Sequence, residues 1–263
     1  MKLRPKKSLG QNFLIDKNVL DLIASLGEID HNDTLIEVGA GTGNLTEKIL
    51  SKRPRKLIVI EKDKNLAINL KKKFNDSIIL INDDILKINE EKIANKKMIF
   101  FGNLPYNIST QILAKWIKKK NLNSICKKCI LMFQKEVADR IIAVENNKQY
   151  GRLAILSSWR MNIKKIKEVS PNSFYPKPKV KSTILVLEPK KKYFQINNPQ
   201  NLEHITRIFF NLRRKMIRKP LSILFKNVDK ISKKLELDTK LRPENLSPII
   251  YYKICKEYEK NLN

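Results

Sequence analysis

Short apolar runs alternate with amphipathic segments through the first half of the chain. Continuous or alternating apolar positions predict strands at 34–38, 57–60, 78–81, 98–101 and 130–133. Apolar residues at helical spacing predict helices at 45–51, 65–74 and 110–118. Strands that alternate with helices in this way predict an α/β domain with a mostly parallel sheet covered by helices on both faces.

Two more strand-like runs follow, at 163–169 and 182–187. The connection between them contains Pro171, Pro176 and Pro178, and it is too short and too rich in proline for a crossover helix. We therefore expect these two strands to form an antiparallel hairpin at the end of the sheet.

The pattern changes after Pro189. Helical spacing predicts four helices and no strand in this part of the chain, at 201–216, 220–225, 228–235 and 249–258. We expect two domains, an α/β domain over 1–189 and a small all-α domain over 190–263.

The charge of the chain indicates which class of molecule the protein binds. The 263 residues carry 54 Lys and Arg against 26 Asp and Glu, a formal net charge of +28. A coding bias toward AT-rich codons explains why Lys outnumbers Arg, but it does not explain the scarcity of acids. This excess indicates binding to an extended polyanion, with nucleic acid the first candidate.

One acid-free helical stretch of the second domain concentrates these cations. We predict that it binds RNA phosphates, and the alternative is a solvated helix face. Its candidate RNA-binding residues are Arg207, Arg213, Arg214, Lys215 and Arg218, with Lys219 beside them.

No apolar run is long enough to span a bilayer. The basic start of the chain is followed by an apolar stretch that Gln11, Asn12, Asp16 and Lys17 interrupt, unlike a signal-peptide core. We expect a cytoplasmic protein. Cys126 and Cys129 have metal-pair spacing, but the two histidines are far from them in sequence, so we expect free thiols and no metal.

The most informative motif is Gly102-Asn103-Leu104-Pro105-Tyr106-Asn107, directly after a predicted strand. Ligands bind at the carboxyl ends of strands in open α/β sheets. Tyr106 can stack on a flat ring, while the Asn103 oxygen and a carbonyl beside Pro105 can accept the two hydrogens of an exocyclic amine. Adenine is such a ring. Alone, the motif also fits a proline turn whose tyrosine packs on the next helix.

A second motif, Glu37-Val38-Gly39-Ala40-Gly41-Thr42-Gly43, also joins a predicted strand to a helix. Its glycines allow a tight turn and a close approach to a ligand, and Glu61 ends the next strand, where an acid can bind ribose hydroxyls. The glycine spacing departs from the dinucleotide pattern, and Glu37 would repel a phosphate. We infer S-adenosylmethionine as the ligand, with Asp83 or Asp84 near its adenine.

These motifs together resemble the KsgA-type small-subunit ribosomal RNA adenine N6,N6-dimethyltransferases. The resemblance extends over nearly the whole chain. Besides the two motifs above, it rests on Ser8-Leu9-Gly10-Gln11-Asn12-Phe13-Leu14, Phe133-Gln134-Lys135-Glu136-Val137, Tyr150-Gly151-Arg152-Leu153, the segment 174–182, Arg213-Arg214-Lys215 and Arg242-Pro243-Glu244-Asn245-Leu246.

The resemblance implies a Rossmann-like methyltransferase domain that transfers two methyls to each of two adjacent adenosines near the 3′ end of small-subunit rRNA. It implies contacts with S-adenosylmethionine from Asn12, Leu14, Gly39, Glu61, Asp84 and Asn103. It implies contacts with the target base from Asn103, Leu104, Pro105, Tyr106 and Phe174, although Phe174 could instead be a hydrophobic plug under a loop. It also implies a role in small-subunit biogenesis, and nothing in the sequence points to obligate oligomerisation.

Three other functions share parts of this pattern. A large-subunit rRNA adenine methyltransferase of the macrolide-resistance type resembles the first domain, but such enzymes tend to carry Asn-Ile-Pro-Tyr. A DNA adenine methyltransferase fits the basic second domain less well. A ribosome-assembly factor that binds immature small subunits, with methylation secondary, is the third.

Overall fold

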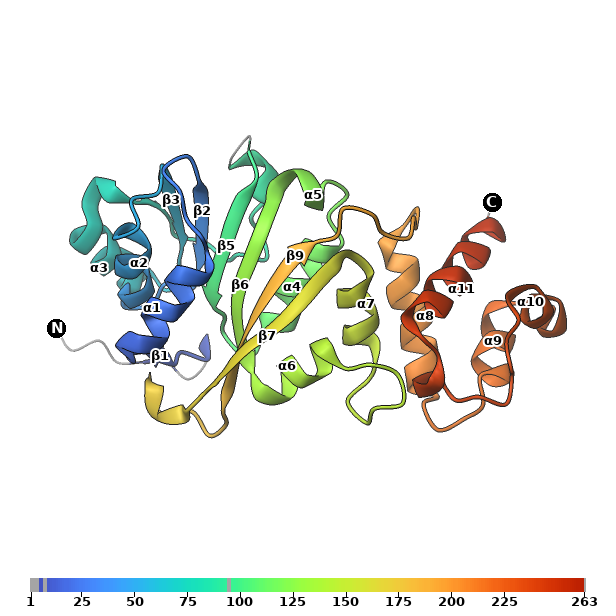
Figure 1. The fold of residues 1–263 in the computed structure, drawn as a ribbon. Coiled ribbons are helices and arrows are strands. Elements are labelled where there is room, and N and C mark those ends of the chain that lie inside the picture. Colours follow the sequence, from blue (N-terminus) through green and yellow to red (C-terminus); the bar gives the residue numbers. More distant parts are fainter. Residues whose placement is uncertain (1–4, 7–8, 94–95, 263) are drawn as a thin grey trace. The chain divides into compact units, whose positions relative to one another are not determined.

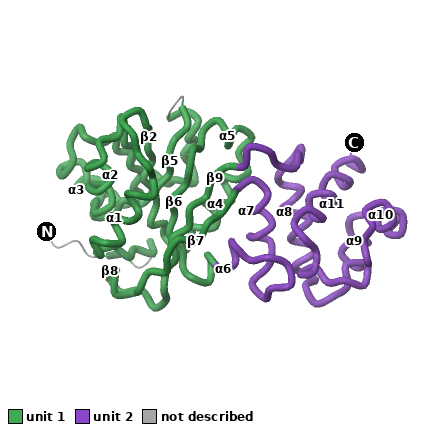
Figure 2. Tube along the Cα trace, viewed as in Figure 1, with its two compact units in different colours: residues 1–138, 162–189 green, residues 139–161, 190–263 purple. Residues whose placement is uncertain are grey.

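The computed structural model describes residues 5–6, 9–93 and 96–262. The chain divides into two compact units, one of residues 1–138 and 162–189 and one of residues 139–161 and 190–263 (Figure 2). One division between the units falls after Pro189, and the second unit also takes in residues 139–161, which the sequence analysis places in the first domain.

The first unit is built on a seven-stranded sheet in the order β4-β3-β2-β5-β6-β9-β7 (Figure 1). Neighbouring strands from β4 to β6 run parallel, whereas β9 runs antiparallel to β6 and pairs with β7 as the expected terminal hairpin. The strands are β2 (Thr34–Val38), β3 (Lys56–Ile60), β4 (Ile79–Ile81), β5 (Met98–Asn103), β6 (Cys126–Gln134), β7 (Met161–Val169) and β9 (Ser182–Pro189).

The strand order places a topological switch point between β2 and β5. From β2 the chain adds β3 and β4 on one side, then returns to add β5 and β6 on the other. The helices that follow β2 and β5 therefore leave on opposite faces of the sheet, which opens a crevice at the carboxyl ends of these two strands. This is the Rossmann-like α/β architecture that the sequence predicts.

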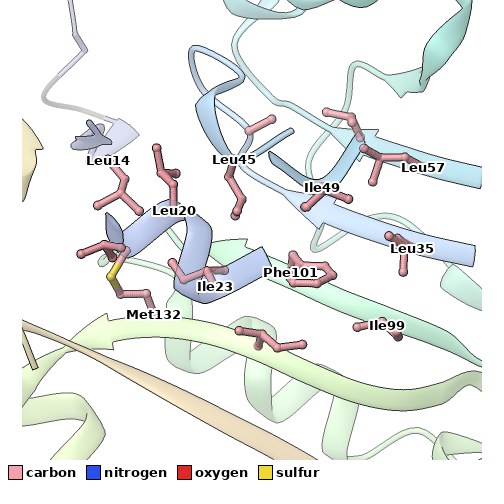
Figure 3. Packing of buried hydrophobic residues seen from close by; sticks show 14 of the residues in the cluster. Leu14, Leu20, Ile23, Leu35, Leu45, Ile49, Leu57, Ile99, Phe101 and Met132 are labelled. Carbon is pink, nitrogen blue, oxygen red and sulfur yellow. The ribbon is translucent and has the colours of Figure 1, made fainter. Parts of the chain in front are cut away.

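Helices cover both faces of this sheet, and the alternation of strand side chains explains how. Leu35, Ile99 and Phe101 point to the face where α1 supplies Leu20 and Ile23 (Figure 3). Phe100 points to the other face, where its ring lies 4.8 Å from that of Trp116 on α4. The helices are α1 (Lys17–Leu26), α2 (Asn44–Leu50), α3 (Lys64–Phe74), α4 (Ser109–Ile117), α5 (Leu122–Ile125) and α6 (Lys135–Ile142), with short turns η2 (Asn75–Ser77) and η3 (Glu90–Lys92).

A two-stranded ladder completes the first unit. The strand β1 (Phe13–Leu14) pairs antiparallel with β8 (Phe174–Tyr175), with Phe13 opposite Tyr175 and Leu14 opposite Phe174. In the preceding turn η4 (Pro171–Ser173), the Ser173 carbonyl accepts hydrogen bonds from the backbone amides of Ile15 and Asp16. The ladder thus fixes the N-terminal segment against the proline-rich connection.

The second unit is helical, with α7 (Arg152–Arg160), α8 (Pro199–Asn211), α9 (Arg218–Leu224), α10 (Val228–Leu235), η5 (Pro243–Asn245) and α11 (Pro248–Lys260). Its core contains Phe209 edge-on to Tyr251, at 5.3 Å between centroids. Tyr150 and Tyr251 donate their buried hydroxyls to the carbonyls of Leu246 and Pro243.

The helix predicted over 201–216 is wrong at its carboxyl end, because α8 stops at Asn211. Ile217 is fully buried and its amide donates to the Leu241 carbonyl, which turns the chain out of the helix. The next helix starts at Arg218, so that Pro220 falls in its first turn, where proline is tolerated. The acid-free basic stretch is therefore a helix end, a turn and a helix start.

Within the described residues, no helix is both long and apolar enough to cross a membrane. Cys126, Cys129 and Cys255 are free thiols, as expected. The described part of the chain contains no group of three or more His, Cys, Asp or Glu residues that could hold a metal ion.

Candidate active site

A pocket opens at the switch point of the first unit. Its empty volume is about 1130 Å³, open mouth included, and its walls come from the carboxyl ends of β2, β3 and β5, from residues 83–85 after β4, and from residues 9–14. Each candidate cofactor-binding residue lines it, namely Asn12, Leu14, Gly39, Glu61, Asp84 and Asn103. The chain thus brings together six residues that are widely separated in sequence.

The glycine turn after β2 forms the floor of the pocket. Gly39 and Gly41 have φ of +71° and +59°, which side chains other than glycine rarely adopt. A Cβ on Gly41 would lie 2.8 Å from Cδ1 of Phe13, so the turn also makes room for the ring of β1. The close approach of backbone and N-terminal segment depends on glycine at this position.

Glu61 ends β3 and is held by backbone amides. Gly41 donates its N–H to Oε2 at 3.0 Å and Asp63 donates to Oε1 at 2.8 Å. Burial raises the pKa of Glu61, while these two bonds act in the opposite direction. Each carboxylate oxygen keeps a further lone pair, so Glu61 can still accept hydroxyl hydrogens from a ligand.

Glu37 lies beneath the turn and lines the pocket, although it is almost completely buried. Thr46 on α2 donates its hydroxyl to Oε2 at 2.6 Å. Burial raises the pKa of Glu37 to about 7, and the Glu61 charge adds to this effect. A ligand cation at this wall would favour the charged form of Glu37.

Both acids after β4 line the pocket, but they differ in their surroundings. Asp84 is partly buried, pairs with Lys62 at 2.9 Å and accepts the Leu86 amide, and the Lys62 bond lowers its pKa. Asp83 is exposed and accepts the Asp84 amide. The Asp84 carboxylate is therefore held in one orientation from two sides, which favours it as the residue that recognises a ligand.

The N-terminal segment lies over the pocket and is fastened to Asp63, a residue for which sequence reasoning found no role. The Asp63 side chain is 3% exposed, caps α3, and accepts Lys6 Nζ at 2.9 Å and Gln11 Nε2 at 3.2 Å. Most of the basic start of the chain lies outside the described residues, as does Ser8 (residues 1–4, 7 and 8). Asp63 lies two residues after Glu61, between a predicted strand and a predicted helix, and this position was the available clue.

The orientation of Asn103 at the end of β5 follows from one contact. Its Nδ2 donates to the backbone carbonyl of Asn12 at 2.8 Å. A carbonyl can only accept, so the amide must present its nitrogen there. The side-chain oxygen of Asn103 therefore remains as a hydrogen-bond acceptor. Asn103 lines the pocket.

Leu104, Pro105 and Tyr106 continue the pocket wall from Asn103. Gly102 makes room for Leu104, since a Cβ on Gly102 would lie 2.6 Å from Leu104 Cδ2. The Tyr106 hydroxyl and the Ser182 hydroxyl are 2.6 Å apart, and burial raises the Tyr106 pKa. The Tyr106 ring is therefore held at its far end by β9.

Phe174 lies outside the pocket wall in this structure, and its contact with a target base stays a prediction. The side chain is 3% exposed, belongs to the core cluster with Leu14 and Leu20, and is absent from the pocket wall. Because side chains alternate along β8, burial of Phe174 turns its neighbour Tyr175 outward. The alternative of a hydrophobic plug describes this arrangement.

Two of the candidate RNA-binding residues of the second unit are paired with acids, and the others are exposed. Arg213 bonds Glu244 and the Lys148 carbonyl, and Arg218 bonds both oxygens of Asp229. Arg207 is exposed beside His204. Arg214 and Lys215 are exposed, as is Lys219, and within the described residues these three make no ion pair.

Comparison with known proteins adds to this geometry. The family model described as ribosomal RNA adenine dimethylase matches residues 2–260. The chain belongs to the ribosomal RNA adenine dimethylase family.

Individual members of this family align along nearly their full length. The chain is 54% identical over 259 residues to the ribosomal RNA small subunit methyltransferase A of Pelagibacter ubique, covering 98% of both chains. It is 41% identical to the protein of that name from Ehrlichia ruminantium, covering 93% of this chain and 94% of the relative.

Solved structures agree with the fold. A dimethyladenosine transferase from Plasmodium falciparum superposes with a TM-score of 0.78 at 27% identity, covering 94% of this chain and 98% of that one. The 23S rRNA methyltransferase ErmE has a TM-score of 0.69 at 20% identity, covering 94% of this chain and all of that one, a likeness that extends to the fold alone.

The pocket of this adenine dimethylase suits a methyl donor of the S-adenosylmethionine type. A Cβ at Gly41 would fill the cradle beside Phe13. Glu61 and Asp84 offer acceptors for hydroxyl and amino hydrogens, and Glu37 adds a third carboxyl to the pocket wall. Apolar residues such as Leu45, Leu66 and Ile85 provide walls for a flat ring.

Proposed function

We propose that this protein transfers methyl groups from S-adenosylmethionine to the N6 amines of two adjacent adenosines near the 3′ end of small-subunit rRNA. The family, and the name shared by relatives up to 54% identical, support this substrate. The observation that carries the chemistry is the Asn103 amide, whose nitrogen is engaged by Asn12 and whose oxygen is left to accept.

The donor half of the site is assigned to the strand ends. Glu61 accepts the ribose hydroxyls, Asp84 accepts the adenine amine, and Gly39 allows the backbone to pass beneath the ligand. Asn12 and Leu14 cover it from the N-terminal segment. When bound, S-adenosylmethionine supplies an electrophilic methyl carbon on a sulfonium.

The acceptor half uses the end of β5. The exocyclic amine of adenine is a poor nucleophile, because its lone pair is delocalised into the ring. Asn103 Oδ1 and the Leu104 carbonyl accept its two hydrogens and favour a pyramidal nitrogen whose lone pair is available. Tyr106 stacks on the ring, and its hydrogen-bonded hydroxyl keeps it in position. Positioning of this kind lowers a barrier by up to about 7–11 kcal/mol for ideal alignment.

No strong base is required of the protein, because the amine proton becomes acidic once nitrogen carries the new bond. The target base must be unpaired or flipped out to reach the pocket. The exposed cations of the second unit bind phosphates of the same RNA, so affinity falls as salt rises. We further propose that the protein acts as a cytoplasmic monomer on immature small subunits.

The test is methyl transfer to whole ribosomal subunits. Purified protein is incubated with isotopically labelled S-adenosylmethionine and unmethylated small or large subunits, and the rRNA nucleosides are identified after digestion. We expect N6,N6-dimethyladenosine in small-subunit rRNA only. Label in large-subunit rRNA would assign the protein to the macrolide-resistance type, and tight binding without label would leave an assembly factor.

A further inference from the structure

The segment from Tyr175 to Lys181, called here the bridging loop, joins two sides of the active-site pocket. At one end β8 pairs with β1, whose Phe13 and Leu14 line the pocket. At the other end Ser182 meets the hydroxyl of the pocket residue Tyr106, and the Lys181 carbonyl accepts the Lys135 amide. The loop is thus anchored on both walls that would hold a bound base.

The composition of the bridging loop is unusual for a connection between strands. Lys177, Lys179 and Lys181 are all exposed, and within the described residues none makes an ion pair. No acid occurs between Glu168 and Glu188. Pro176 and Pro178 alternate with the lysines, and the chain bends at residues 176, 179 and 180. The three lysines therefore lie close together on one short, exposed and irregular segment.

Tyr175 is the first residue of the bridging loop. It is 61% exposed, among the most exposed large side chains of the chain. It lies directly opposite Phe13 in the ladder, and directly opposed residues of an antiparallel pair project from the same face. Tyr175 therefore presents an exposed aromatic ring on the same face of the ladder as the pocket residue Phe13.

We propose that the bridging loop holds the RNA strand beside the target base, with Tyr175 stacking on the adenosine next to the one in the pocket and the lysines contacting its phosphates. This inference rests on the proposed function, because it takes the substrate to carry two adjacent adenosines. While one adenosine occupies the pocket, its neighbour requires a surface at the mouth. An exposed aromatic followed by three exposed cations within the next six residues matches a stacked base with its backbone alongside.

The experiment is a double-mutant cycle between Tyr175 and that neighbouring base. The full-length protein, saturated with S-adenosylhomocysteine so that no transfer occurs, is titrated with an oligoribonucleotide whose unpaired loop carries two adjacent adenosines. The same RNA is prepared with either adenosine replaced by an abasic residue. Tyr175→Ala, Tyr175→Phe and Tyr175→Trp are compared with the unchanged protein.

We expect Tyr175→Ala to weaken binding of the intact RNA roughly 5- to 150-fold, the range for loss of one stacked base. Removing one of the two bases should weaken the unchanged protein similarly but leave Tyr175→Ala nearly unaffected. Tyr175→Phe and Tyr175→Trp keep a stacking surface and should bind as the unchanged protein does. Two results would overturn the proposal. In the first, each abasic RNA weakens binding by Tyr175→Ala and by the unchanged protein equally. In the second, neither abasic RNA weakens binding by either protein.

The lysines are tested through salt. Replacing Lys177, Lys179 and Lys181 with Gln should reduce the slope of log affinity against log salt concentration by about 2, since each single-strand phosphate contact contributes about 0.7. Lys52→Gln is the control, because Lys52 is exposed in the turn before β3, at the amino end of that strand, whereas the pocket lies at the carboxyl ends of the strands. If Lys52→Gln lowered the slope by as much as each bridging-loop lysine does, the effect would be one of general charge and would contradict the assignment.

These measurements remain informative if the proposed function fails. Binding is measured without methyl transfer, so a protein that does not methylate small subunits can still show, or lack, coupling between Tyr175 and one base. A protein that methylates them without this coupling would retain the proposed function and lose the bridging-loop assignment.

Discussion

At the scale of single residues, buried polar groups decide how this site works. Glu37, Glu61 and Asp63 are all largely removed from water, yet each keeps a defined hydrogen-bond partner. Burial of an acid without an opposite charge raises its pKa, and Glu37 shows this most strongly. Stability should therefore depend on pH through this residue.

Glu37→Gln tests that dependence. The pKa of Glu37 rises from an ordinary 4.5 to about 7 on folding, so the folded state binds the proton more tightly than the unfolded state. Its contribution is complete below pH 4.5 and is lost as the pH rises to about 7, at a cost of about 3 kcal/mol. Gln retains an acceptor for Thr46 and cannot ionise. Urea unfolding should show the variant gaining stability relative to the unchanged protein between pH 5 and pH 8, whereas a pH-independent difference would refute the assignment.

Gly41→Ala tests the glycine turn. The alanine would have φ near +59° and its Cβ would meet Phe13, so we expect a loss of about 2–4 kcal/mol in unfolding free energy and weaker donor binding. Gly151→Ala is the matched control, because φ there is −179° and the nearest side-chain atoms are 3.8 Å from the new Cβ. Chemical denaturation and calorimetry with S-adenosylmethionine measure the two effects, and equal behaviour of both variants would contradict the strain argument.

At the scale of elements, the N-terminal segment links donor binding to catalysis. It lines the pocket, is fastened to Asp63 by Gln11, and gives the Asn12 carbonyl to Asn103. Asp63 in turn donates its amide to Glu61. One segment therefore contacts both the assigned donor residues and the assigned acceptor residue.

Gln11→Ala should loosen that segment. Loss of a hydrogen bond to a buried carboxylate costs about 1.5–3 kcal/mol, which corresponds to roughly a 10- to 100-fold higher KM for S-adenosylmethionine. We expect kcat to fall as well, because Asn103 loses its fixed partner. Gln111→Ala, on the exposed side of α4, is the control and should leave both constants unchanged. A stability loss without any change in KM would show that the contact is only structural.

Periodicity in the sequence predicted some elements with the bounds that the structure shows and missed others. The strand at 34–38 and the helix at 228–235 have the predicted bounds. The helix α7 was missed because Ala154, Ile155, Leu156, Ser157, Trp159 and Arg160 are all buried, which leaves no amphipathic stripe. The helix α1 was missed although Asp16 caps it and Val19, Leu20, Ile23 and Ala24 follow a helical stripe.

The candidate site was predictable where residues lie at the carboxyl end of a strand, as Asn103 does in β5, or directly after one, as Glu61 does after β3. Sequence could not show that Phe174 is buried, because that depends on the pairing of β8 with β1. Nor could it show that Arg213 and Arg218 are held by Glu244 and Asp229, since these acids lie outside the basic stretch. Asp63 gained its role only through contacts with residues far away in sequence.

At the scale of the whole molecule, we expect the net charge of +28 to supply affinity for RNA and the surroundings of each cation to decide how much it contributes. Arg214→Gln/Lys215→Gln should weaken RNA binding across sequences and lower the salt slope by about 0.7–0.9 for each phosphate that is no longer neutralised. Arg218→Gln removes the same kind of charge from an ion pair with Asp229 and should affect RNA binding far less. Filter binding across a salt series measures both, and an equal effect of Arg218→Gln would contradict this division.

In the proposed mechanism, Asn103 is oriented by Asn12 and activates the target amine. The most direct test is single-turnover methyl transfer by Asn103→Ala to unmethylated small subunits, with subunit affinity measured in parallel. We predict a rate at least about 100-fold lower, as for loss of one oriented group at a reacting centre, with subunit affinity unchanged within a factor of about three. A variant that methylates small subunits at the rate of the unchanged protein would contradict the account.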